Sequence, residues 1–130
     1  MQRNKFFHSN SLDISNRSTA VAEIPSAAEI KAIANNMLML GHTRVEINFG
    51  FTMVNKKDKY VKKIGREYAL KNMKKHILKV ESMEITSKYI FINLEKPCEK
   101  YSLTLSLNRD TDYSSVKFYP KYPINLPEGW

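Results

Sequence analysis

A strict two-residue alternation over residues 44–53 constrains the fold of this chain more than any other feature. Every second position in this run is apolar: Val45, Ile47, Phe49, Phe51 and Met53. Because successive side chains of a β-strand point to opposite faces, the pattern predicts a strand with one buried face and one face in water. Gly50, in the middle of the run, indicates a bulge or a close approach of another part of the backbone.

A helix is expected just before this strand, over residues 27–40. Ser26 and Glu29 have the spacing of a capping box, in which each side chain satisfies a backbone N–H of the other residue. Apolar residues then recur at helical spacing, and Gly41 offers a left-handed stop at the C-terminus.

The remainder of the chain is rich in strand patterns, at about residues 77–85, 88–94, 100–107 and 113–118. The short connections between these segments favour antiparallel pairing. The sequence therefore predicts an α+β fold, with an antiparallel sheet of about five strands and two helices packed on one face.

The length of 130 residues fits one domain. We expect a mobile N-terminal arm over residues 1–25, a single α+β domain over 26–119 and an extended, proline-rich strap over 120–130. No run approaches the roughly 20 apolar residues of a membrane span, and the polar N-terminus lacks a signal-peptide core. A cytoplasmic protein with no membrane partner is therefore expected.

The positive charge of the chain is concentrated in one segment. Lys and Arg number 21 against 13 acids, a net charge of +8. Residues 56–79 hold ten of the bases and only two of the acids, so the segment carries the whole excess and the rest of the chain is neutral. A localised excess of this kind is typical of a surface that faces an anionic partner.

A second helix is expected in this basic segment, from about Asp58 to Lys74. On a helical wheel Tyr60, Val61, Ile64 and Tyr68 form an apolar stripe beside Gly65, and we expect this stripe to rest on the sheet, where close packing against the preceding strand explains the glycine. The opposite side is basic and forms the predicted anion-binding site: Lys59, Lys62, Lys63, Arg66 and Lys74.

The segment from Val54 to Ala69 resembles a block found in small uncharacterised bacteriophage proteins. In that block an Asp, an aromatic residue two positions later, basic residues, Gly-Arg and Ala follow in order, as Asp58, Tyr60, Gly65, Arg66 and Ala69 do here. The resemblance implies a phage origin, in which proteins of this size are often inhibitors or host-takeover factors.

Residues that would support catalysis are poorly arranged. The three histidines are far apart, and the single cysteine, Cys98, excludes a disulfide framework and lies near two acids that raise a thiol pKa. Asp110 and Asp112 are open to two interpretations, as ligands of a nuclease metal or, more simply, as residues of a hairpin turn. We expect no enzyme activity, metal or cofactor.

The sequence therefore predicts a non-enzymatic, phage-type protein that binds nucleic acid, or a host complex that handles nucleic acid, through its lysine-rich helix. Lysines suit contacts with the phosphate backbone rather than readout of bases. The alternative is an anti-defence (for example anti-CRISPR) or host-takeover inhibitor that binds an acidic surface of a host protein. In that case aromatic residues are the expected anchors: Tyr60, Tyr119, Tyr122 and Trp130.

Overall fold

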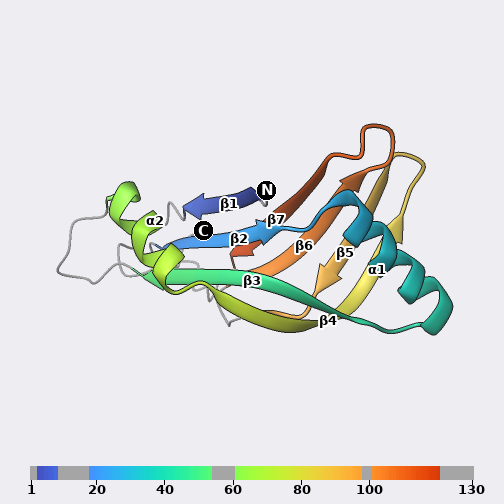
Figure 1. Cartoon of the computed structure of the whole chain (residues 1–130), viewed down its shortest axis with the longest axis horizontal. Coiled ribbons are helices and arrows are strands. Elements are labelled where there is room, and N and C mark those ends of the chain that lie inside the picture. The colour runs from blue at the N-terminus through green and yellow to red at the C-terminus, as the bar shows by residue number, and fades with distance from the viewer. Residues whose placement is uncertain (1–2, 9–17, 54–60, 98–100, 121–130) are drawn as a thin grey trace, which may run out of the picture.

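Seven antiparallel strands follow one another across a single sheet in the same order as in the chain (Figure 1). The structure, a computed structural model, describes residues 3–8, 18–53, 61–97 and 101–120. Within these ranges the strands are β1 (Arg3–His8), β2 (Ser18–Ile24), β3 (Arg44–Met53), β4 (Lys74–Ile85), β5 (Tyr89–Leu94), β6 (Tyr101–Asn108) and β7 (Ser114–Pro120). The helices of this described part are α1 (Ala27–Leu40) and α2 (Lys62–Lys71).

The alternating residues of the strands line the inside of a curved sheet. In β3, Val45, Ile47 and Phe49 are buried, whereas Arg44 before them and Glu46 among them are exposed. The predicted strand at 44–53 is therefore confirmed. The same alternation in β5 and β6 places further aliphatic side chains in one continuous core: Ile90, Ile92, Leu94, Leu103, Leu105 and Leu107.

The sheet curls until its first and last strands meet, which makes the fold nearly a closed barrel. The Arg3 guanidinium of β1 donates hydrogen bonds to the carbonyl (3.0 Å) and the hydroxyl (2.8 Å) of Ser114 in β7. Phe7 of β1 stacks on Phe118 of β7, with ring centroids 5.8 Å apart. An irregularity in β4 between Val80 and Ser82 interrupts the register with β5, and such bulges bend a strand.

The predicted sheet of about five strands with both helices on one face is wrong. The sheet has seven strands within the described residues, and the two extra strands, β1 and β2, lie in the segment expected to be an arm. The sequence of β2 shows no alternation because all of residues 18–22 are buried, with Ala20 and Ala22 facing the core and Thr19 and Val21 facing α2. A strand that is buried on both faces loses the period of two.

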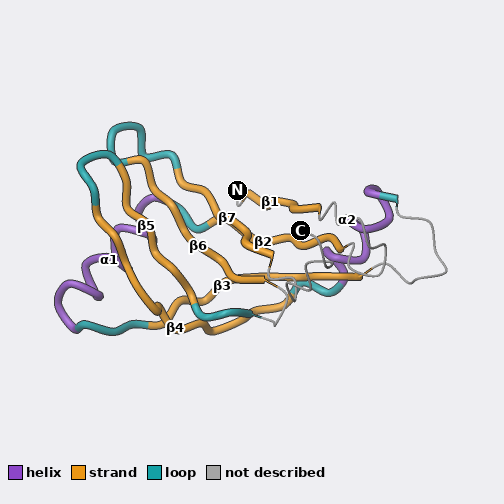
Figure 2. The backbone as a smooth tube through the Cα atoms, turned by 180° about the vertical axis from the view of Figure 1, so that it is seen from behind, coloured by secondary structure: helices purple, strands orange, loops and turns teal. Residues whose placement is uncertain are grey.

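The two helices pack on opposite faces of the sheet and lie toward opposite ends of it (Figure 2). Helix α1 covers the inner face with Ile30 and Ala34. The predicted helix at 27–40 is confirmed with both of its ends: the Ser26 hydroxyl accepts a hydrogen bond from the Glu29 N–H (3.2 Å), and Gly41 has a φ of 75°.

Helix α2 packs on the outer face of β2 and β3, at the points where the side chains are smallest. A Cβ added to Gly50 in β3 would lie 2.1 Å from the Ala69 carbonyl oxygen of α2. A Cβ added to Gly65 in α2 would lie 2.3 Å from the Thr19 hydroxyl of β2. The close approach expected at Gly50 is therefore confirmed, whereas Gly65, which was expected to pack against the preceding strand, contacts β2 instead. The two glycines let the helix backbone lie directly on the sheet.

Truncating an inward side chain of β3 should destabilise the fold far more than truncating its outward neighbour. We expect Ile47→Ala to lower the free energy of unfolding by about 2–5 kcal/mol, since it removes buried methyl groups and leaves a cavity. Glu46→Ala, on the exposed face of the same strand, should change it by no more than about 0.5 kcal/mol. Urea denaturation of both variants measures the difference, and equal losses would contradict the one-sided burial of β3.

Adding a methyl group at Gly50 should displace α2. Because the new Cβ would meet backbone atoms of Ala69 and Met73, no side-chain rotation relieves the clash. We expect Gly50→Ala to destabilise the protein by about 1–3 kcal/mol, as overpacked sites do. Hydrogen exchange should show the amides of α2 losing protection while those of β5 and β6 retain it. Unchanged protection of α2 would contradict this account of its docking.

Candidate functional site

Helix α2 is buried through only two of its residues. Gly65 and Ala69, four positions apart, face the sheet, and the other positions from Lys62 to Lys71 are exposed. A helix that rests on the sheet through such small side chains keeps most of its circumference in water. Four bases lie on this exposed surface, which we call the α2 basic surface: Lys62, Lys63, Arg66 and Lys71.

The structure brings most, though not all, of the predicted anion-binding residues together. Lys62, Lys63 and Arg66 lie on α2 as expected, and Lys59 is outside the described residues. Lys74 is not on the helix, because α2 ends at Lys71 and Lys74 is the first residue of β4. The predicted helix was too long at this end because the N–H of Met73 bonds to the Leu70 carbonyl in a tight last turn before β4 begins. Lys71 was missed as a site residue.

The predicted apolar contact of α2 is wrong. Val61, Ile64 and Tyr68 were expected to rest on the sheet, but their exposed fractions are 41%, 48% and 52%. The helix is turned so that Gly65 and Ala69 make the contact instead, since only small residues allow the close approach to β2 and β3. The apolar side chains therefore lie in the open beside the bases. Tyr60, which belonged to the same predicted stripe, is outside the described residues.

The bases of α2 are not neutralised by neighbouring carboxylates of the described segments. The ion pairs found there join Lys31 to Asp112 (2.9 Å) and Lys75 to Glu46 (3.7 Å), and neither involves α2. Glu67 is the one acid in the sequence of α2. The Lys71 ammonium lies 5.8 Å from the centre of the Tyr68 ring. This surface therefore presents a concentrated positive charge to the solvent.

His8 of β1 lies within the field of this charge. Its Nδ1 atom is 3.0 Å from the hydroxyl of Thr19, the residue that Gly65 packs against. Burial is the main cause that lowers the pKa of His8, and the positive charges of Lys62 and Arg66 lower it further. No local pattern in the sequence points to His8, because the contact depends on the pairing of β1 with β2.

Of the predicted aromatic anchors the structure describes Tyr119, which does not join the α2 basic surface. Tyr119 lies on β7 with 49% of its surface exposed, and it lines a groove on the outer face of β4–β7 together with Asn93 and Lys96. Tyr122 and Trp130 are outside the described residues.

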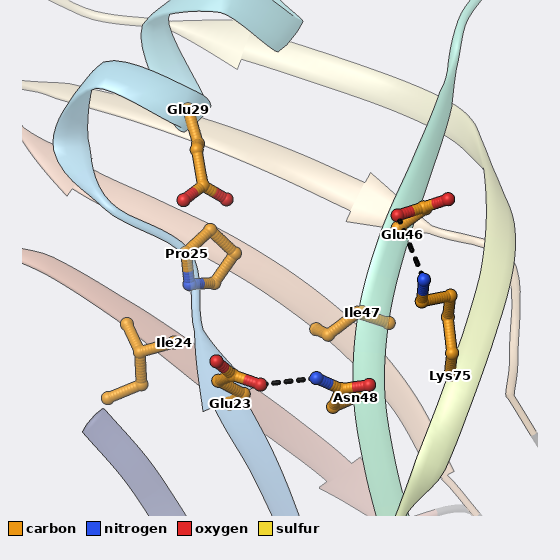
Figure 3. A pocket seen from close by; sticks show the side chains of 8 residues that line it. All are labelled: Glu23, Ile24, Pro25, Glu29, Glu46, Ile47, Asn48 and Lys75. Carbon is orange, nitrogen blue, oxygen red and sulfur yellow. Dashed lines mark hydrogen bonds and ion pairs between the residues drawn. The ribbon is translucent and has the colours of Figure 1, made fainter. Parts of the chain in front are cut away.

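A small hollow on the outer face has the opposite charge (Figure 3). It has a volume of about 190 Å³ and lies between the end of β2, the start of α1 and β3. Three carboxylates line it, from Glu23, Glu29 and Glu46, but the Asn48 amide donates to Glu23 and Lys75 pairs with Glu46. The Glu29 carboxylate accepts a hydrogen bond from the Ser26 hydroxyl (3.3 Å), so each of the three carboxylates has a partner within the protein, and the α2 basic surface remains the candidate site.

The structure gives Asp110 and Asp112 the role of turn residues. Both lie between β6 and β7, where the Asn108 carboxamide oxygen accepts a hydrogen bond from the Asp110 N–H (2.9 Å). Asp112 has a φ of 55° and pairs with Lys31 of α1. Among the described residues no group of three His, Cys, Asp or Glu side chains is placed to hold a metal ion, and Cys98 is outside them.

No helix of the described part combines the length and the apolar character needed to cross a bilayer. Comparison of the chain with protein-family models, with curated proteins and with solved structures finds no match. The interpretation of the site therefore depends on its own geometry and charge.

The pKa of His8 should report the charge of α2. Because Lys62 and Arg66 disfavour the protonated imidazole, replacing both with Gln should raise the pKa of His8 toward 6.5, without reaching it while the ring stays partly buried. A pH titration of the ring signals by NMR measures the change. His76, whose pKa is lowered by burial and by Lys74, is an internal control and should not move. An unchanged pKa of His8 would show that the field of α2 does not reach β1.

Proposed function

We propose that this protein is a non-enzymatic nucleic-acid-binding protein that contacts the phosphate backbone through α2. The observation that carries the proposal is the α2 basic surface, whose four exposed bases make no ion pair with the described residues. Lys74 follows at the start of β4 and adds a fifth positive charge.

The arrangement of charge favours a ligand over a merely solvated helix face. An exposed helix that serves only solubility gains stability from acids placed four residues from its bases. Helix α2 has one such acid, Glu67, four residues from Lys63 and from Lys71, against four bases. Most of its charges are therefore of one sign and repel one another, and Lys62 and Arg66 add to the effect of burial in lowering the pKa of His8. Such repulsion is relieved when phosphates bind and their counterions are released.

The type of base supports contact with phosphates rather than readout of sequence. Three of the four bases on α2 are lysines, which act as point charges, and Arg66 is the one residue able to form a bidentate pair. We therefore expect weak discrimination between sequences. The phage origin implied by the segment from Val54 to Ala69 and the host cytoplasm as the site of action remain part of this proposal.

A second candidate function is inhibition of a host protein through an acidic surface, as an anti-defence or host-takeover factor would do. The exposed apolar residues of α2 favour it, because Val61, Ile64 and Tyr68 lie beside the bases. An apolar centre with a charged rim is the usual composition of a protein–protein interface. A partner retained from host lysate after nuclease treatment, and lost when Ile64 and Tyr68 are changed to Ser, would favour this function.

Charge reversal on α2 should greatly weaken binding to nucleic acid without unfolding the protein. If about five bases neutralise phosphates of a DNA duplex, log K should fall against log salt concentration with a slope of about −4 to −5. Changing Lys62, Lys63 and Arg66 together to Glu should reduce the magnitude of that slope to about 2 or less, because three contacts are lost. Fluorescence anisotropy with a labelled duplex at about 50–200 mM NaCl measures both slopes.

The matched control places the same change of charge on other elements. Lys88, Lys96 and Lys117 lie outside α2 and are exposed, so the variant that changes them to Glu has the same net charge as the α2 variant. It should retain most of the wild-type slope. Equal loss of binding in both variants would show that the attraction depends only on net charge, and absence of binding by the wild type at about 50 mM salt would contradict the proposal.

A further inference from the structure

A cavity of about 520 Å³ opens where the end of α2 meets β3 and β4. Its volume is within the range of pockets that hold small organic ligands. Its wall combines basic and apolar side chains: Phe51, Lys71, Met73, Lys74, His76 and Pro97. Lys71 also belongs to the α2 basic surface, so the cavity continues from that surface.

The two kinds of side chain in the wall suit the two parts of a nucleotide. Lys71 and Lys74 supply positive charge, and none of the described residues that line the cavity is an acid. Phe51 supplies an aromatic ring, and Met73 and Pro97 add apolar surface. A phosphate needs the positive charges, and a planar base needs the aromatic ring and the apolar surface.

The wall is held in place before any ligand arrives. The Asn72 amide donates a hydrogen bond of 3.0 Å to the carbonyl of Phe51, which fixes the end of α2 to β3. The absence of a side chain at Gly50 lets the backbone of Met73 approach the same strand. A preformed pocket avoids the entropy loss of ordering its wall on binding.

His76 adds a group that can report on the cavity. Its ring lies edge-on to Phe49, with centroids 5.7 Å apart, and faces the same space as Lys74. Burial and the charge of Lys74 lower the pKa of His76, so an anion beside Lys74 would raise it.

We propose that this cavity holds one nucleotide of a single-stranded nucleic acid, with its phosphate on Lys71 and Lys74 and its base against Phe51. The inference rests on the proposed function, in which α2 binds the phosphates of the same strand. A single strand is favoured because the bases of a duplex are stacked and paired, so that none enters a pocket without being extruded.

The test compares a labelled single strand of about 12 nucleotides with a duplex of the same length. We expect the wild type to bind the single strand more tightly. Phe51→Leu should weaken binding of the single strand by about tenfold, the size of one lost stacking contact, and weaken binding of the duplex much less. Lys74→Gln, which removes one phosphate contact, should also weaken binding of the single strand by about tenfold. Lys74 variants remain informative if Phe51→Leu disturbs the core, because Lys74 is exposed.

The control is Lys79→Gln, which removes the same charge from the same strand. The register of β4 against β3 places Lys74 opposite Phe49 and Lys79 opposite Arg44, and Lys79 does not line the cavity. This variant should bind the single strand like the wild type. If Lys74→Gln and Lys79→Gln weaken the single strand equally, the cavity is not the site.

A titration with free dAMP distinguishes a single strand from a mononucleotide as the ligand of the cavity. Added to the wild type, dAMP should shift the NMR signals of His76, and it should bind far more weakly than the 12-mer because the α2 contacts are missing. Binding of dAMP as tight as that of the 12-mer would overturn the single-strand inference in favour of a mononucleotide site. A different result would overturn this inference and leave the proposed function standing. In that result the variant with Lys62, Lys63 and Arg66 changed to Glu loses binding to both the duplex and the single strand, whereas Lys74→Gln binds the single strand as tightly as the wild type does.

Discussion

The aromatic cluster around Tyr101 holds the two ends of the sheet together, and the rest of the architecture depends on it. The ring centroid of Tyr101 lies 5.6–6.3 Å from the ring centroids of Phe7, Phe51 and Phe118, which belong to β1, β3 and β7. The Tyr101 hydroxyl is hydrogen-bonded to Ser18 of β2, which satisfies the polar group of a fully buried side chain. Because these rings and α1 fill the interior, α2 packs on the outside.

The exposure of α2 follows from what lies beneath it. The outer face of β2 and β3 offers Thr19, Val21 and Gly50 to the helix, and this small, flat area accepts only Gly65 and Ala69. A helix with large buried side chains would be restricted to one polar stripe, whereas this helix displays bases and apolar residues over most of its circumference. The same contact therefore stabilises the helix and creates the candidate binding surface.

Sequence patterns predicted the elements whose apolar side chains lie on one face. Strand β3 and helix α1 each have one face in the core, so their periods of two and 3.6 residues are visible. Strand β2 is buried on both faces, and β1 depends on β2 and β7, so neither has a local signal. The concentration of charge in the sequence predicted the bases on α2, but no sequence pattern predicted which side of α2 faces the sheet. The helical wheel places Gly65 beside an apolar stripe that was expected to rest on the sheet, whereas Gly65 itself makes the contact.

The order of the strands also determines how the molecule assembles and opens. Each ladder joins two strands that are consecutive in the chain, so forming it closes only the loop between neighbours. The contact of Arg3 and Phe7 with β7 instead spans almost the entire described chain. Closing this seam between β1 and β7 has the largest entropy cost of loop closure. Side chains, rather than a backbone ladder, hold it together. We therefore expect the seam between β1 and β7 to be the last part of the barrel to form and the first to separate in a local opening.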